Sequence, residues 1–230
     1  MLSTAAFGSA ISVSPLLVNM QAGQRFSQVQ VRNVGTDTAY VTADVSKVIN
    51  PGMPNQQILK MQDDPEKIGL IALPNKMIIP PHQERLLRFY LLQPTPRSID
   101  QVYHVFVSPV EGEIEAVKQP RENPNGSIGT VHAGIRIILA YGIKIFVRPK
   151  NPQPHLVFDR TGKHLTIKNI GNSNVLVTLV EQCQAGHCQK VPGLVQRYYV
   201  GNVYSAALPY NAPVNVYQEY MGQYQKDTVK

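Results

Sequence analysis

Apolar and polar residues alternate in short segments along the chain, the pattern of strands that bury one face. In the first part of the sequence the alternating segments are 26–34, 40–48, 70–79, 86–91 and 101–107. Pro74 interrupts the third of them, and turn-forming residues lie between them, as at 34–37 and 50–52. No segment has helical periodicity. Strands that recur roughly every 8–15 residues between turns predict an all-β protein built as a sandwich.

The longest such pattern covers residues 131–149, VHAGIRIILAYGIKIFVRP. Every second residue forms one apolar row: Ile135, Ile137, Leu139, Tyr141, Ile143, Ile145 and Val147. The alternate positions are mixed and include Lys144. We therefore predict one long strand with one wholly apolar face. Because strands usually have about 3–10 residues, this one is expected to run past the body of its domain or to serve two surfaces.

The apolar row has two interpretations. The half from Tyr141 to Val147 is assigned to the domain core, as in any central strand of a sandwich. For Ile135, Ile137 and Leu139 the pattern alone favours neither the core nor an exposed face. An exposed apolar strand is an aggregation hazard unless another chain pairs with it, so exposure would indicate a binding edge.

Three prolines within 149–154, PKNPQP, mark the clearest boundary, since proline resists sheet pairing and stiffens a linker. The alternating segments that follow are 156–158, 164–169, 175–181, 196–200 and 214–219. We predict two β domains, 11–149 and 155–230, joined by the linker 150–154. The second domain is small, so a disulfide would help to compensate for its limited core.

The two cysteines, Cys183 and Cys188, flank a turn-like Gln-Ala-Gly-His segment and can meet disulfide geometry across a hairpin. A zinc site would need four ligands, and only His187 is close in sequence. The leading interpretation is a structural disulfide formed in an oxidising compartment. The alternative is two buried thiols in a cytosolic protein.

Residues 1–10, MLSTAAFGSA, resemble the end of a secretory signal, with small residues at a cleavage site before a mature chain that starts at Ile11. The alternative is a floppy tail. A secretory signal would agree with a disulfide at Cys183 and Cys188.

The net charge is +7 and the pI about 9.4, but lysine and arginine are spread along the chain. This distribution argues against a nucleic-acid arm or a polybasic membrane anchor and is compatible with attraction to acidic partners. No apolar run approaches the roughly 20 residues of a membrane span. The histidines lack metal-ligand spacing, and no nucleophile elbow or phosphate-binding glycine loop occurs. We therefore expect no enzyme, no metal and no cofactor.

Five longer segments carry a resemblance: VSPLLVNMQAGQRFSQVQVRNVG (13–35), LIALPNKMIIPPHQERLLRFY (70–90), GIKIFVRP (142–149), VLVTLVEQCQAGHCQKV (175–191) and RYYVGNVYSAALPY (197–210). In this order and spacing the chain resembles the periplasmic pilus-assembly chaperones of chaperone–usher systems. The last two segments and residues 48–52 are most similar to the colonisation-factor (alpha) type. The resemblance covers nearly all of 11–222.

The resemblance implies two immunoglobulin-like β-sandwich domains arranged as an L. It also implies donor-strand complementation in the periplasm of a Gram-negative bacterium, where the chaperone lends a strand to pilus subunits that lack their last one. Ile135, Ile137 and Leu139 match the donor residues, and each would contribute about 1.5–3 kcal/mol when it fills a groove in the subunit. The implied partners are major and minor pilus subunits and an outer-membrane usher. Self-association through the donor edge is compatible with this function.

Two basic residues have matches in the family. Lys144 matches the anchor for the subunit's C-terminal carboxylate, with a solvated lysine as the alternative. The family's second anchor is usually an arginine in the first strand, and by spacing Leu17 stands at that position here. Either the second positive charge comes from elsewhere, with Arg25 as one candidate, or the anchor depends on Lys144 alone.

Arg148 matches a basic residue that pairs with acids across the domain interface. By spacing, these acids are Asp100 and Glu219. Such a network would fix the angle between the domains more than it would add stability. The alternative is three unrelated surface charges.

Another two-domain immunoglobulin-like extracytoplasmic binding protein or pilus structural protein is the main alternative function. A pilin would normally be one domain whose N-terminal extension carries alternating apolar residues. Here the alternating segment lies inside the chain, before the interdomain linker, which favours the chaperone.

Overall fold

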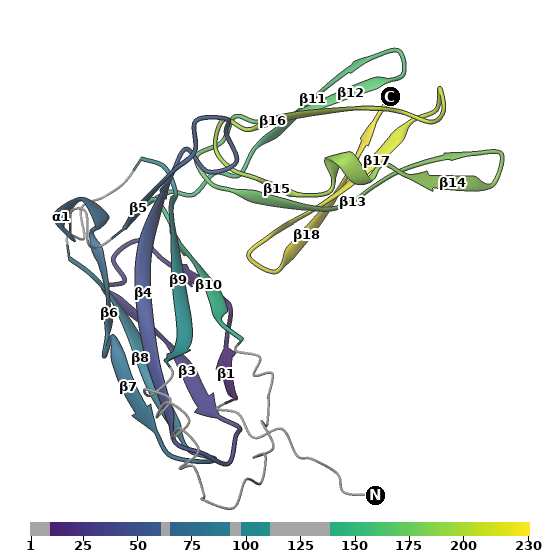
Figure 1. Cartoon of the computed structure of the whole chain (residues 1–230). Helices are drawn as coiled ribbons and strands as arrows, with labels where there is room; N and C mark the ends of the chain where they lie inside the picture. Colours follow the sequence, from purple (N-terminus) through teal and green to yellow (C-terminus); the bar gives the residue numbers. More distant parts are fainter. Residues whose placement is uncertain (1–9, 61–64, 93–97, 111–138) are drawn as a thin grey trace, which may run out of the picture.

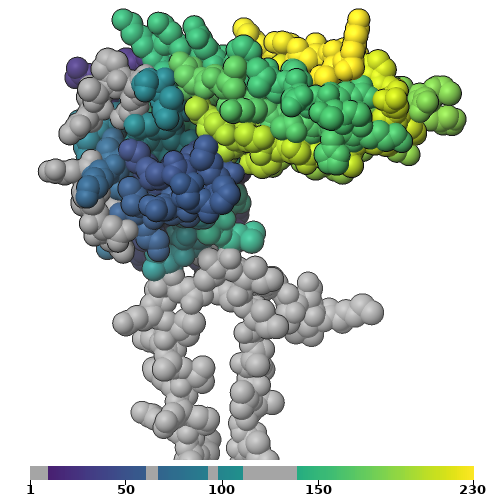
Figure 2. All heavy atoms as spheres, turned by 90° about the horizontal axis from the view of Figure 1, so that it is seen from above, coloured from purple at the N-terminus to yellow at the C-terminus, as the bar shows by residue number. Residues whose placement is uncertain are grey.

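The computed structural model describes residues 10–60, 65–92, 98–110 and 139–230. Over this part of the chain nearly every element is a strand, apart from α1 (Pro65–Ile68) and the short 3-10 helix η1 (Pro192–Leu194). The strands form two sandwiches arranged as an L, which confirms the predicted fold class (Figure 1). Seen from above, the second sandwich extends away from one end of the first (Figure 2). The predicted signal-like residues 1–9 lie outside the described residues.

The first sandwich packs a four-stranded sheet on a six-stranded sheet. The four-stranded sheet has the order β1 (Ile11–Ser14), β3 (Phe26–Asn33), β8 (Glu84–Leu91) and β6 (Leu70–Leu73). The six-stranded sheet has the order β2 (Leu17–Met20), β10 (Tyr141–Val147), β9 (Gln101–Val110), β4 (Ala39–Ile49) and β5 (Gln57–Lys60), and β7 (Lys76–Ile79) also pairs with β4.

The predicted strand over 70–79 is in fact two strands, β6 and β7, which belong to opposite sheets. The chain changes sheet at Pro74, because proline has no N–H group to donate to a ladder. A similar change of sheet occurs at Pro15, between β1 and β2. The positions of both prolines were visible in the sequence, but the change of sheet was not.

The first core lies between these two sheets. Val29 and Val31 of β3 and Val41, Ala43 and Val45 of β4 are buried in it, and the residues between them point outward. This is the period-2 alternation from which the strands were predicted. The core therefore forms because each sheet carries an apolar inner face.

The second sandwich begins at Leu156, after the proline-rich segment that follows β10. Its three-stranded sheet has the order β11 (Leu156–Thr161), β12 (His164–Asn169) and β16 (Val203–Ala207). Its five-stranded sheet has the order β14 (His187–Lys190), β13 (Val175–Gln184), β17 (Val214–Tyr220) and β18 (Gln223–Val229), and β15 (Arg197–Tyr198) also pairs with β13. A separate cluster that includes Leu165, Val177 and Val216 forms its core.

A buried asparagine closes an equivalent turn in each sandwich. Asn33 ends β3 and Asn169 ends β12, and in each the side-chain amide donates to two backbone carbonyl groups. The Oδ1 atom of each accepts the N–H of a glycine two residues later, Gly35 or Gly171, at 2.9 Å. These bonds satisfy buried polar groups that would otherwise destabilise the fold.

Candidate functional site

Strand β10 has one edge that is only partly covered. It pairs along its whole length with β9, from Tyr141 to Val147. On its other side it pairs in parallel with β2, but only from Lys144, which is opposite Leu17. The chain before β2 crosses to the other sheet, where β1 pairs with β3, so none of the strands described covers this side of β10 ahead of Lys144. Unpaired backbone N–H and C=O groups on a sheet edge are a template for another strand.

Part of the predicted apolar row lies in the described strand β10. Ile143, Ile145 and Val147 are buried in the first core, which confirms the core assignment of this half. Leu139, just before the strand, is 67% exposed. Ile135 and Ile137 lie outside the described residues. Of the predicted strand 131–149, the described part is 139–149, and within it the strand is Tyr141–Val147.

Lys144 lies on the opposite face of β10 and belongs to a row of four side chains across the sheet. The register aligns Leu17 on β2, Lys144 on β10, His104 on β9 and Ser46 on β4. Lys144 and Leu17 are exposed, and His104 is half-buried. Burial, followed by the positive charge of Lys144, lowers the pKa of His104 below its ordinary value.

Arg25, the alternative second anchor, belongs to the other sheet. Its carbonyl accepts the backbone N–H of Leu91, the last residue of β8, at 3.0 Å. The predicted anchor position Leu17, in contrast, stands directly beside Lys144.

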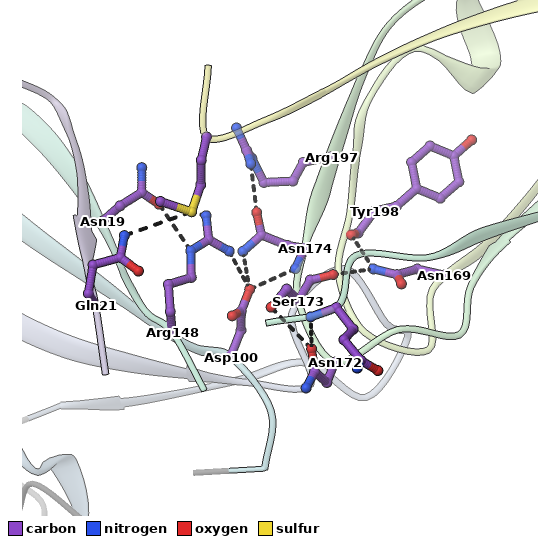
Figure 3. Close-up of polar contacts among 12 residues, drawn as sticks. Asn19, Gln21, Asp100, Arg148, Asn169, Asn172, Ser173, Asn174, Arg197 and Tyr198 are labelled. Carbon is purple, nitrogen blue, oxygen red and sulfur yellow. Dashed lines mark hydrogen bonds and ion pairs between the residues drawn. The ribbon is translucent and has the colours of Figure 1, made fainter. Parts of the chain in front are cut away.

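Arg148 and Asp100 form an ion pair at the joint between the sandwiches (Figure 3). Nη1 of Arg148 donates to Oδ2 of Asp100 at 2.6 Å. The same carboxylate oxygen accepts the backbone N–H of Asn174 at 2.7 Å and also its side-chain amide. Asn19 of β2 accepts two further N–H groups of Arg148. The network thus ties β2, β10 and the segment before β9 to the segment before β13.

The pKa of the buried Asp100 carboxyl is under opposing influences. Burial raises the pKa of this carboxyl above its ordinary value, while Arg148 and the hydrogen bonds from Asn174 act in the opposite direction. A carboxylate in such a place depends on its partners, because an unpaired buried charge is strongly destabilising.

Glu219, the other acid predicted for this network, has different contacts. It accepts the backbone N–H of Gly222 at 2.7 Å, and its charge acts on Arg197 of β15. Among the described contacts of Arg148, Asp100 is present and Glu219 is not. The structure therefore brings together two of the three predicted residues.

Aromatic rings surround the two arginines of the joint. The Arg148 guanidinium lies 5.1 Å from the ring centres of both Phe146 and Tyr220, and the Arg197 guanidinium lies 4.9 Å from that of Phe146. Phe146 also packs against Tyr199 of the second sandwich. These cation–π contacts orient the guanidinium groups while burying their flat faces.

A second set of contacts joins the sandwiches at the turn between β4 and β5. Nδ2 of Asn202 donates to the carbonyl of Pro51 at 3.0 Å, and the Tyr204 hydroxyl donates to the carbonyl of Gly52 at 3.2 Å. Gly52 has φ +71°, and a Cβ there would lie 2.6 Å from Oδ1 of Asn202. Only glycine allows the turn to approach this closely.

Sequence reasoning missed the polar partners at this joint: Asn19, Asn174, Arg197, Asn202 and Tyr204. Each is one of many polar residues in loops or on strand faces, and none has a distinctive spacing from Arg148. The segment 48–52 was noted as similar to the alpha type, but its contact with the second sandwich had no signal in the pattern. Contacts between two domains depend on their mutual orientation, which local periodicity does not encode.

The predicted disulfide is present at the end of the second sandwich. Cys183 of β13 and Cys188 of β14 are directly opposite in the hairpin and are bonded to each other. This confirms the hairpin interpretation of the two cysteines.

In the described ranges no helix has the length and apolar character needed to cross a membrane. Over the same residues no three His, Cys, Asp or Glu side chains come together as a metal site.

A family model matches more than half of the chain. Residues 10–153, more than half of the chain, match the family model described as pili and flagellar-assembly chaperone, PapD N-terminal domain. No curated protein sequence matches the chain.

Several solved structures share the fold over the whole chain. The class 5 fimbriae chaperone CfaA is 18% identical with a TM-score of 0.65, covering 96% of this chain and 99% of its own. A chain from the Salmonella enterica complex of SafA pilin with the SafB chaperone is 14% identical with a TM-score of 0.65, covering 98% and 97%. A chain from the chaperone–tip adhesin complex of CFA/I fimbriae biogenesis is 19% identical with a TM-score of 0.63, covering 96% and 99%. As its motifs predicted, the chain belongs to the family of pilus-assembly chaperones.

Proposed function

We propose that this chain binds, folds and caps pilus subunits in the periplasm by donor-strand complementation and delivers them to an outer-membrane usher. The observation that carries the proposal is the partly uncovered edge of β10, which continues into the exposed Leu139. An open edge next to an apolar side chain is a hazard in a protein without a partner and a binding element in a protein with one.

The energetics of strand addition fit this edge. A subunit strand that pairs with it gains backbone hydrogen bonds that do not depend on sequence, and alternate side chains give specificity. Ile135, Ile137 and Leu139 have the spacing to enter one groove, and each contributes about 1.5–3 kcal/mol when fully buried. An incomplete subunit sandwich, which lacks one strand, is the partner whose groove fits such a segment.

Lys144 is proposed as the anchor for the subunit's C-terminal carboxylate. It shares its face of β10 with Phe146, which contacts Tyr199 and Arg197, so it belongs to the face of β10 that packs toward the second sandwich at Phe146. No other described residue forms a hydrogen bond or ion pair with this ammonium. A charge-assisted bond to a terminal carboxylate would fix the register of the subunit along the donor edge.

The remaining features are compatible with this function. A disulfide is typical of an oxidising compartment such as the periplasm. Two of the similar structures contain a chaperone with a pilin or with a tip adhesin, which are partners of the proposed kind. Without a client, self-association through the donor edge would cover the same apolar surface.

The test is capture of co-expressed pilus subunits by full-length variants. Ile137→Asp and Leu139→Asp place a charge in the groove and are expected to abolish capture without unfolding the chaperone. Ile78→Asp is the matched control, since Ile78 is an aliphatic residue on β7 that is 60% exposed. It should capture subunits normally.

Thermal unfolding of each variant verifies that the fold is intact. Undiminished capture by Ile137→Asp and Leu139→Asp would refute the donor-strand assignment. An equal loss in Ile78→Asp would indicate a general effect of surface charge instead. Failure of the intact chain to retain any pilus subunit would favour the alternative of another extracytoplasmic binding protein.

A further inference from the structure

Lys144 is the one basic residue on the paired strands β2 and β10. Leu17, at the position where the family usually has an arginine, flanks Lys144 on one side and has no polar group to offer. The residue that flanks Lys144 on the other side is His104 of β9. In this row across the sheet, Lys144 therefore has an apolar neighbour on one side and a titratable neighbour on the other.

The imidazole of His104 is available for a ligand. The hydrogen bond from the Ser46 hydroxyl goes to the backbone carbonyl of His104 and leaves its ring free. The ring packs edge-on against Phe106, with centres 6.5 Å apart and an angle of 84°. No described residue forms a hydrogen bond with either ring nitrogen.

His104 and Lys144 are close enough to act on the same ligand. Directly opposed residues of antiparallel strands have Cβ atoms about 4.5–5.5 Å apart and point to the same face. The two side chains also influence each other electrically, because the Lys144 charge helps to lower the pKa of His104. A carboxylate placed between them can accept a hydrogen bond from each.

We propose that His104 is the second donor of the carboxylate site and binds the client's terminal carboxylate together with Lys144. This inference rests on the proposed function, since it names a second residue of the same anchor. His104 takes the role that Leu17 cannot fill, from the opposite neighbouring strand.

The pairing couples client capture to protonation. In the free chain Lys144 repels a proton from His104, whereas a bound carboxylate attracts one, so binding favours the imidazolium form. Capture should tighten as the pH falls, by at most about tenfold per pH unit for one proton taken up.

Other charges near His104 are few. On β4, Asp44 is opposite Phe106, one row away, and on β5, Lys60 lies beyond Ser46. These two charges have opposite signs, and neither is directly opposite His104 in the register, as Lys144 is. On β2 the row ends with the apolar Leu17. Among these charges, Lys144 therefore has the largest influence on the pKa of His104.

The experiment uses the full chain and a short synthetic peptide that copies the C terminus of the subunit that the chain captures. The peptide is made with a free carboxylate and with an amide. Affinities are measured by calorimetry from about pH 7.5 to about pH 5.5, around the ordinary pKa of histidine. The variants are His104→Gln and Lys144→Ala, and His164→Gln is the control because His164 is an exposed histidine of β12 in the other sandwich.

For the intact chain and His164→Gln we expect the free-acid peptide to bind more tightly at low pH. His104→Gln should bind it less tightly at low pH and without pH dependence, and the amidated peptide should bind equally at all pH values. In NMR spectra the pKa of His104 should rise when the free-acid peptide is added.

The outcomes separate the two proposals. If neither Lys144→Ala nor amidation weakens binding, or if the chain captures no subunit, the proposed anchor itself fails. If both weaken binding while His104→Gln keeps the affinity and pH dependence of the intact chain, only the role of His104 is overturned.

Discussion

Arg148 and Asp100 are joined at 2.6 Å by an ion pair whose two side chains are 2% and 3% exposed. Arg148 directly follows β10, and Asp100 contacts Asn174 of the second sandwich. The Arg148 guanidinium thus connects the end of β10 to the joint of the L. We expect the orientation of the second sandwich relative to the proposed anchor Lys144 to depend on this pair.

Replacing Arg148 by methionine should destabilise the chain by about 3–5 kcal/mol, because it leaves the Asp100 carboxylate buried without its charged partner. Asp100→Asn should also destabilise the chain, since it leaves the buried Arg148 guanidinium without its charged partner, although the amide oxygen can still accept from Asn174. The double variant should lose less than the sum of the two single losses. Urea unfolding of all four proteins measures this coupling, and simple additivity would show that the pair does not interact.

The Gly52 turn should act as a second support of the interdomain angle. Gly52→Ala places a Cβ 2.6 Å from Oδ1 of Asn202 and should displace the turn from the second sandwich. Gly162→Ala is the matched control, because Gly162 also has positive φ, +59°, but its Cβ would meet nothing within 4 Å.

Both alanine variants carry the cost of a left-handed residue, about 1–2 kcal/mol. Only Gly52→Ala should also broaden the distribution of interdomain angles, as measured by small-angle X-ray scattering. Identical scattering from Gly52→Ala and Gly162→Ala would mean that the turn does not hold the domains.

Removing the disulfide should weaken the second sandwich and leave the first unchanged. Cys183 and Cys188 are 5 residues apart, and closing so short a loop stabilises the fold by about 2 kcal/mol in the chain-entropy model. The double serine variant and the reduced protein should therefore unfold at lower urea concentration in the second sandwich. A reductant should have no effect on the serine variant, and any effect there would have another cause.

The stability of the free chain should decrease in mild acid because of His104. Its pKa is lowered on folding, so the unfolded chain takes up this proton first as the pH falls through about 6.5. The contribution of His104 to the free energy of unfolding is therefore fully present above about pH 6.5 and is lost as the pH falls below it. Unfolding free energies from about pH 7 to about pH 5 should fall more steeply for the intact chain than for His104→Gln. Parallel curves would show that burial and the Lys144 charge do not lower the pKa of His104 on folding.

Local sequence determined which segments are strands. The alternating segments 26–34, 101–107 and 214–219 correspond to β3, β9 and β17 within a few residues. Such strands are predictable because the period of two and the turn residues at their ends are local properties. The apolar half of β10 and the disulfide hairpin followed from the same kind of pattern.

Other elements had no local signal. Strand β18, QYQKDTV, was not predicted, because it is mostly polar and lacks an alternating pattern. It is a strand because it pairs along its whole length with β17 at the edge of its sheet. The segment 196–200 appeared as a strand, but only Arg197–Tyr198 pairs with β13. In both cases the position in the sheet, rather than the side-chain pattern, decided the outcome.

The sequence by itself determined the fold class, the disulfide and, through its motifs, the family, and it singled out Lys144 and Arg148 as candidate residues. Only the tertiary structure decided what those residues face. His104 lies opposite Lys144, and Asn174 lies beside Asp100, because strands and domains far apart in sequence meet in one register. The open edge of β10 has the same origin, since it exists because β1 crosses to the other sheet. Alternation specifies which face of a strand is buried, whereas long-range pairing specifies its neighbours.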